Sequence, residues 1–144
     1  MSETETLKKV MLKLGAKNWI KIWRNNTGQA WQGKRFGLKR GTRVFDEMGR
    51  PIIVEPGDIM IRGAHPVNFG LTGSGDIAGI IAPKGIVIYI ETKYGRYKQT
   101  EQQKRFAKMI QDMGGIYIVA RDPDTVEQQI IDELRLRHGW NGKF

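Results

Sequence analysis

The chain has 144 residues and a formal net charge of +9, and this length fits one domain with a modest hydrophobic core. It has no cysteine and only two, widely separated histidines, which excludes disulfide scaffolds, thiol nucleophiles and cysteine-type zinc sites and argues against a histidine-type zinc site. The basic balance indicates a polyanionic partner, with nucleic acid favoured over a membrane surface because no predicted helix pairs a basic face with a bulky aromatic one.

The first predicted helix begins at Ser2 and ends at Gly15. Ser2 and Glu5 have the spacing of a capping box, and apolar residues recur at helical spacing until the glycine. Helical rotation places Glu3 within the apolar stripe, so we expect this acid to point inward. The N-terminus does not resemble a signal peptide, and no apolar run approaches the roughly 20 residues that span a bilayer, so we expect a soluble protein.

A short strand is predicted over residues 19–23, followed by an Asn- and Gly-containing turn. Residues 31–67 have the weakest pattern, and we interpret them as an inserted flap or hairpin region. Within this insertion, residues 42–54 have the pattern of a β-hairpin about the sequence Asp46-Glu47-Met48-Gly49.

Two apolar runs flank the turn at residues 83–85 and predict an antiparallel hairpin. If the turn is centred between residues 83 and 84, Ile81 faces Ile86 and Asp76 faces Glu91. Opposed like charges destabilise a strand pair unless something neutralises them. Glu91 and Lys93 share a face of the strand, because residues two apart point the same way.

A divalent cation between Asp76 and Glu91, with the Lys93 ammonium beside it, would resolve this repulsion, and hard cations such as Mg²⁺ favour carboxylate oxygens. The backbone carbonyl of Thr92 offers a further oxygen ligand. Such a cation lowers the pKa of bound water and polarises a phosphate, while a lysine stabilises developing negative charge. These residues therefore supply the parts needed to hydrolyse a phosphodiester.

The C-terminal half predicts a helix over residues 101–113, with Thr100 as N-cap and Gln103 on its core-facing side. A buried strand over residues 116–120 follows, and Asp122-Pro123 is expected to start a final helix. A strand, a helix and a second strand in succession indicate a parallel crossover pair. We therefore predict an α/β fold, one domain over residues 1–144 with a central mixed sheet flanked by helices.

Several phrases of the sequence resemble the PD-(D/E)XK nucleases and, more narrowly, the stand-alone VRR-NUC nucleases of phages and bacteria. The resemblance covers most of the chain, except residues 31–67. It is carried by Arg24-Asn25-Asn26-Thr27-Gly28, Phe69-Gly70-Leu71, Gly75-Asp76, Ile90-Glu91-Thr92-Lys93 and Gln103 on the following helix. Residue 75 is glycine where the superfamily name has proline, a departure that the family tolerates.

The resemblance implies a restriction-endonuclease-like core and a magnesium-dependent endonuclease acting on DNA, in which Mn²⁺ substitutes. Asp76 and Glu91 would be metal ligands, and Lys93 the catalytic lysine. Gln103 would lie near the metal-bound water or the phosphate, and Glu3 would match an acidic residue on the first helix. Stand-alone members are similar to homodimeric junction-resolving enzymes, which implies a homodimer that cuts four-way (Holliday) DNA in the cytoplasm of a bacterial or phage-infected cell.

Basic and aromatic residues are expected to bring phosphates to this site. Residues 31–43 suit phosphate contact and base stacking, and residues 94–98 directly follow the catalytic lysine. The residues that we expect to contact DNA are Arg24, Asn26, Lys34, Arg35, Lys39, Arg40, Arg96 and Lys98.

Alternatives stay open at this point. Glu91 and Lys93 could form only a structural salt bridge, and Glu3 could interact only with the helix dipole. The enzyme could be a nicking or restriction-like nuclease on linear or flap duplex DNA, or the chain could be a non-catalytic nucleic-acid-binding module. The sequence has no Walker-type phosphate loop, so no nucleotide cofactor is expected.

Overall fold

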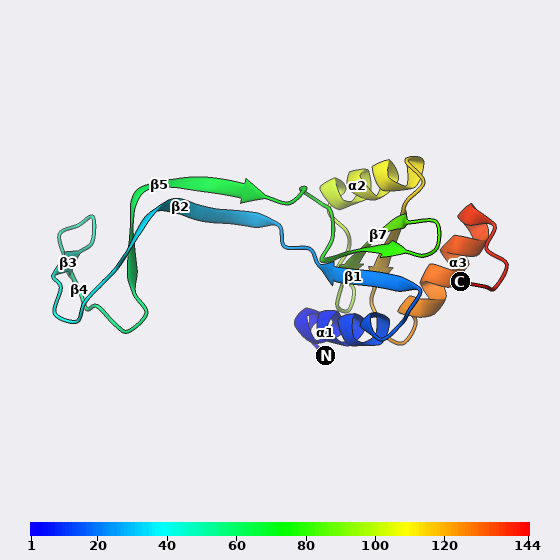
Figure 1. Ribbon diagram of the computed structural model, residues 1–144, viewed down its shortest axis with the longest axis horizontal. Coiled ribbons are helices and arrows are strands. Elements are labelled where there is room, and N and C mark those ends of the chain that lie inside the picture. Colours follow the sequence, from blue (N-terminus) through cyan, green and yellow to red (C-terminus); the bar gives the residue numbers. More distant parts are fainter. The chain divides into compact units, whose positions relative to one another are not determined.

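The computed structural model describes residues 1–144, which divide into two compact units. Residues Met1–Thr27 and Gly70–Phe144 form the first, here called the core unit, and Gly28–Phe69 forms the second, here called the ribbon unit (Figure 1). The ribbon unit is an insertion in the sequence of the core unit, and it includes residues 31–67. None of the helices has the length and apolar character needed to cross a membrane.

A four-stranded mixed sheet forms the centre of the core unit, in the order β1-β6-β7-β8. β1, β6 and β7 are antiparallel neighbours, and β8 runs parallel to β7. The predicted α/β class with a central mixed sheet is therefore confirmed. The strands are β1 (Ile20–Arg24), β6 (Ile77–Ile81), β7 (Ile86–Thr92) and β8 (Ile116–Ala120).

The β6–β7 hairpin has the register that its turn predicts. Ile81 pairs with Ile86, directly beside the turn. At the open end of the hairpin, the backbone N–H of Asp76 donates to the carbonyl oxygen of Ile90 at 2.9 Å. Asp76 therefore lies next to Glu91, as far from the turn as this strand pair allows.

Three helices complete the core unit: α1 (Glu3–Gly15), α2 (Glu101–Asp112) and α3 (Val126–His138). α1 and α3 contribute to the main hydrophobic core together with Ile88 and Ile90 of β7. α2 covers the opposite face of the sheet (Figure 1).

On the α2 face, Phe106 packs edge-on against Tyr89 of β7, with the ring centroids 4.9 Å apart. Because successive strand residues point to opposite faces, Glu91 shares the face of Tyr89. The alternation along β7 thus directs an acid toward α2 and not into the aliphatic core.

Two of the three helix starts agree with the sequence prediction. Ser2 with Glu5 caps α1, and Thr100 with Gln103 caps α2, each through a reciprocal capping box. The predicted start of the third helix is wrong, because α3 begins at Val126. The Asp122 carboxylate accepts a hydrogen bond from the backbone N–H of Asp124 at 2.9 Å, and this local turn occupies the side chain that would have capped a helix.

The ribbon unit consists of two long antiparallel strands and a short terminal hairpin. β2 (Gly28–Gly37) pairs with β5 (Ile59–Phe69), and β3 (Val44–Phe45) pairs with β4 (Pro51–Ile52) around residues 46–49. The hairpin expected within residues 42–54 is therefore confirmed. No residue of this unit is buried, so neither face of the ribbon contributes to a hydrophobic core.

A bulge interrupts the pairing of β2 with β5 between Gln32 and Lys34. A Cβ on Gly33 would lie 2.6 Å from a methyl carbon of Ile61 and 2.7 Å from the carbonyl oxygen of Arg62. Only glycine fits here, because both distances are shorter than van der Waals contact allows. The sequence therefore fixes the position of this bulge within the ribbon.

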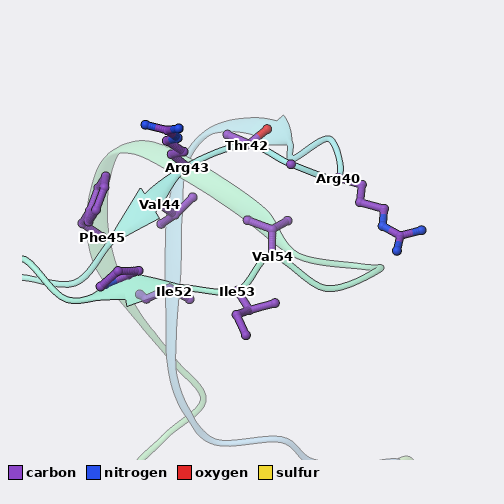
Figure 2. A pocket seen from close by; sticks show the side chains of 10 residues that line it. Arg40, Thr42, Arg43, Val44, Phe45, Ile52, Ile53 and Val54 are labelled. Atoms are coloured by element: carbon purple, nitrogen blue, oxygen red, sulfur yellow. The ribbon is translucent and has the colours of Figure 1, made fainter.

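The terminal hairpin and the segments beside it surround a hollow of about 570 Å³. Figure 2 shows the side chains around it, with the guanidinium groups of Arg40 and Arg43 pointing outward in different directions. The rest of the lining is mainly apolar, and no carboxylate takes part. The lining residues are Arg40, Gly41, Thr42, Arg43, Val44, Phe45, Pro51, Ile52, Ile53 and Val54.

Candidate active site

Three carboxylates come together at one end of the sheet in the core unit. Glu3 is the first residue of α1, Asp76 directly precedes β6, and Glu91 lies near the end of β7. Ligand oxygens of all three lie within 4.8 Å of one another. The structure thus brings together acids that are 73 and 15 residues apart in the sequence, in a geometry that can hold a metal ion.

Glu3 lies at the rim of this cluster. As expected, it lies on the same helical face as the buried Leu7 and Val10, and its carboxylate lies within 4.8 Å of those of Asp76 and Glu91. The residue itself is exposed, because the buried positions of α1 begin at Thr6 and Leu7, one turn further along. Glu5 is occupied by its capping-box hydrogen bonds.

Asp76 is held in place by the end of β7. Its Oδ2 accepts hydrogen bonds from the backbone N–H of Thr92 at 2.8 Å and from the Thr92 hydroxyl at 2.6 Å. No side chain or backbone group donates to Oδ1. One oxygen is therefore anchored, and the other remains available to a ligand.

The backbone before Asp76 explains why residue 75 is glycine. Gly75 has a φ of +86°, and a Cβ there would lie 3.0 Å from the carbonyl oxygen of Ile90. Proline cannot adopt this conformation, because its ring fixes φ near −65°. Glycine at position 75 therefore allows a backbone conformation that proline could not adopt.

Glu91 is the most buried of the three acids, with 4% of the residue exposed. Its Oε1 accepts hydrogen bonds from the Lys93 ammonium at 2.8 Å and from the Gln103 amide at 2.5 Å. Burial raises the pKa of the Glu91 carboxyl, and the negative charge of Asp76 raises it further, although Lys93 and Gln103 oppose the shift.

Lys93 is the one cation beside these acids, and only 13% of its side chain is exposed. Burial by itself would lower the pKa of the ammonium, but the hydrogen bond to Glu91 and the charges of Glu91, Glu3 and Asp76 together raise it. Both Glu91 and Lys93 thus hold protons more tightly than usual. This is the electrostatic signature of a site with excess negative charge, which a cation would offset.

Gln103 connects the site to α2. Its Oε1 accepts from the backbone N–H of Thr100 at 2.8 Å, and its Nε2 donates to Glu91. The same side chain therefore caps the helix and fixes the acid. Of the residues predicted for this site, the structure brings together Glu3, Asp76, Glu91, Lys93 and Gln103.

Thr92 was expected to offer its carbonyl oxygen to a metal, and that role stays a prediction. What the structure adds is the hydroxyl, which sequence reasoning missed. Thr92, between Glu91 and Lys93, gave no signal of its own in the sequence, because its contact is with Asp76 across the hairpin.

Asn25 is a second residue that sequence reasoning missed as part of the site. Its amide donates to the hydroxyl of buried Ser74 at 2.7 Å and to the carbonyl oxygen of Gly75 at 2.9 Å, and its backbone N–H donates to the carbonyl oxygen of Asp76 at 2.8 Å. Asn25 therefore fixes the segment that carries the acid. The only signal in the sequence was its place in the turn between residues 24 and 28.

Tyr117 of β8 lies behind the acids on the α2 face. Burial raises the pKa of its phenol well above the usual range, and the negative charge of Glu91 adds to the effect. Its hydroxyl donates to the carbonyl oxygen of Gly73 at 3.4 Å, a weak hydrogen bond. The phenol is therefore uncharged and forms one side of the site.

The residues expected to contact DNA are all exposed, and they are divided between the two units. The core unit carries Arg24, Asn26, Arg96 and Lys98, and the ribbon unit carries Lys34, Arg35, Lys39 and Arg40. Their exposure is compatible with contact to a large ligand, and the contacts themselves stay a prediction.

The sequence matches no family model and no curated protein. Three clustered carboxylates with free oxygens, a buried ammonium and an amide fit a hard divalent cation that prefers oxygen ligands. With such a cation, this arrangement can polarise a phosphate and activate water.

Proposed function

We propose that this protein is a metal-dependent DNA endonuclease that hydrolyses phosphodiester bonds, with Mg²⁺ as cofactor and Mn²⁺ as a substitute. The observation that carries the proposal is the cluster of Glu3, Asp76 and Glu91 with the Lys93 ammonium 2.8 Å from Glu91. A structural salt bridge would need only one acid for this lysine. The two further carboxylates support a metal site instead, because they add repulsion that no other protein cation beside them offsets.

Each residue of the site would have a separate role in hydrolysis. Asp76 and Glu91 would hold the cation, which when bound supplies Lewis-acid activation of the phosphate and lowers the pKa of water. Lys93 remains charged, because its pKa is raised, and its ammonium would donate hydrogen bonds to the phosphate oxygens on which negative charge develops. Gln103 orients Glu91 and has a second amide hydrogen available to a water or a phosphate oxygen.

The topology around the site supports a restriction-endonuclease-like core and membership of the VRR-NUC nucleases as part of the proposal. An antiparallel hairpin carries Asp76 and Glu91, and a helix with Gln103 leads to a parallel strand. The order of these elements and residue types matches the resemblance seen in the sequence.

Four-way DNA as the substrate and a homodimer as the active form also belong to the proposal. A two-fold dimer would offer two active sites to opposed strands of a junction, whose own symmetry is approximately two-fold. Both expectations rest on the resemblance and not on an observed interface.

The test is cleavage of labelled four-way, flap and linear DNA by the purified protein, with Mg²⁺, with Mn²⁺ or with chelator. We expect metal-dependent cuts in four-way DNA. Equal cutting of linear and four-way DNA would remove the junction preference and favour a restriction-like or nicking enzyme.

Variants separate catalysis from binding. Asp76→Ala and Lys93→Ala should bind DNA and not cut it, while Lys84→Ala, at the far end of the β6–β7 hairpin, should cut normally. A non-catalytic nucleic-acid-binding module is the less favoured reading, because clustered acids repel a polyanion. Normal cutting by the Asp76 and Lys93 variants would show that the site is elsewhere.

A further inference from the structure

The paired part of β2 and β5, here called the stem (Gly28–Gly37 and Ile59–Phe69), carries only positive charge. It contains Lys34, Arg35 and Arg62 and no aspartate or glutamate, whereas residues 38–58 beyond it have equal numbers of basic and acidic residues. None of the three stem cations forms an ion pair. The stem therefore has unneutralised positive charge of its own.

Two of these cations lie directly opposite each other. Lys34 and Arg62 are paired residues of the two strands, so their side chains share a face. Both lie over the ring of Phe36, with the Lys34 ammonium 5.2 Å and the Arg62 guanidinium 5.0 Å from its centroid. The ring offsets part of their repulsion, because its face is electron-rich. An anion between the two cations would offset the rest.

The third cation is on the other face. Arg35 pairs with Ile61, next to the Lys34 pair, and neighbouring residues of a strand point to opposite faces. A ribbon that lay on a single anionic surface would need cations on one face only. Cations on both faces suit a ribbon inserted between two anionic walls.

We propose that the stem inserts into the major groove of B-form DNA, with Lys34 and Arg62 binding phosphates of one strand and Arg35 binding phosphates of the other. The major groove of B-DNA admits a two-stranded β-ribbon, whereas the major groove of A-form RNA is too deep and narrow for side chains to read. The ten residues of β2 span about 33 Å, which is close to one turn of the duplex.

The exposure of the ribbon unit supports binding to a ligand as large as a DNA duplex. Neither face of the ribbon is covered, and Trp31 is 60% exposed. A two-stranded ribbon alone is only marginally stable in water, so contacts with a duplex would stabilise it. The choice of DNA as the polyanion rests on the proposed nuclease function, but binding by the stem is a separate property.

The experiment measures binding of the full-length protein to a 20-base-pair DNA duplex without metal, in chelator, over a series of salt concentrations. Each phosphate contact contributes about 0.9 to the slope of log affinity against log salt. Lys34→Ala and Arg62→Ala should each reduce the slope by about 1, and the double variant by about 2. Lys84→Ala, which removes an exposed, unpaired cation of the core unit, should leave the slope unchanged.

Two comparisons complete the test. The DNA duplex should bind more tightly than an RNA duplex of the same sequence, and more tightly than single-stranded DNA. Equal binding of the RNA duplex, or a double variant with the wild-type slope, would overturn the inference. Lys34→Gln and Arg62→Gln keep a long side chain but remove the charge. They should reduce the slope as the alanine variants do, which shows that the loss of charge and not of packing lowers it.

The outcomes for the stem and for the core site are separable. If the Lys34 and Arg62 variants keep the wild-type salt slope while the protein still cuts DNA with metal, only the groove-binding inference is overturned. If these variants reduce the slope but the protein cuts no DNA with any metal, only the nuclease function is overturned. The binding measurement contains no metal, so it does not depend on the acids.

Discussion

Replacing Thr92 with valine removes one hydroxyl from the candidate site and keeps the shape of the side chain. Thr92 is fully buried, and its hydroxyl donates to Oδ2 of Asp76 at 2.6 Å. The backbone N–H of Thr92 donates to the same oxygen at 2.8 Å and is unaffected by the substitution. The valine variant should therefore weaken the anchoring of Asp76 without abolishing it.

The size of the effect follows from the kind of hydrogen bond. A hydrogen bond to a charged group contributes about 1.5–3 kcal/mol, and a factor of ten in affinity corresponds to about 1.4 kcal/mol. Replacing residues that orient metal ligands typically lowers metal affinity about 10–100-fold. Because the N–H bond to Asp76 remains, we expect a loss of about 10-fold for Thr92→Val, at the lower end of this range.

The matched control is Thr92→Ser, which keeps the hydroxyl and loses a methyl group. It should bind metal like the wild type and lose about 1 kcal/mol of stability through the buried methyl group. Calorimetric titration with Mn²⁺ measures the affinity, and urea denaturation measures the stability. Wild-type affinity in the valine variant, or equally weak binding in the serine and valine variants, would refute the assigned role of the hydroxyl.

Four further predictions concern Glu91, Gly75 and Asn25. Acidification should weaken metal binding through Glu91, because burial raises the pKa of its carboxyl in the metal-free protein, so the Mn²⁺ affinity in calorimetric titration should begin to fall at a pH above the usual glutamate range. In the metal-free protein, the stability that Glu91 contributes below its unfolded-state pKa should be lost as the pH rises through its raised folded-state pKa, and Glu91→Gln should flatten this dependence in thermal unfolding. Gly75→Ala should lower the free energy of unfolding by about 1–3 kcal/mol, measured in urea, because the φ of +86° disfavours a side chain; an unchanged value would contradict the strain. Asn25→Ala should cost about 1–3 kcal/mol in the same assay, because the buried Ser74 hydroxyl loses its partner, and Asn26→Ala, at an exposed position, is the control.

Local geometry made much of the core unit predictable. The turn at residues 83–85 determines which residues face each other, so Asp76 and Glu91 could be placed together from the sequence. The capping boxes at Ser2 and Thr100 were also readable, because each depends on residues only three positions apart. Where one local rule competes with another, as at the start of α3, the sequence pattern did not decide between a turn and a cap.

The contacts that position the acids were not predictable in the same way. The hydrogen bond between Asn25 and Ser74 joins residues 49 positions apart, and no periodic pattern encodes it. The ribbon unit was hard to assign for a different reason. Since neither of its faces is buried, its strands lack the alternation of apolar and polar residues on which strand prediction depends.

The proposed function requires that the acids at the end of β6 and β7 hold a cation for the cleavage of DNA. Its most direct test compares wild-type protein with Asp76→Asn, a variant of nearly the same shape, on labelled four-way DNA with Mg²⁺ and with chelator. We expect cuts by the wild type with Mg²⁺, none in chelator, and none by the variant although it still binds the DNA. Cleavage by Asp76→Asn at the wild-type rate, or by the wild type in chelator, would contradict it.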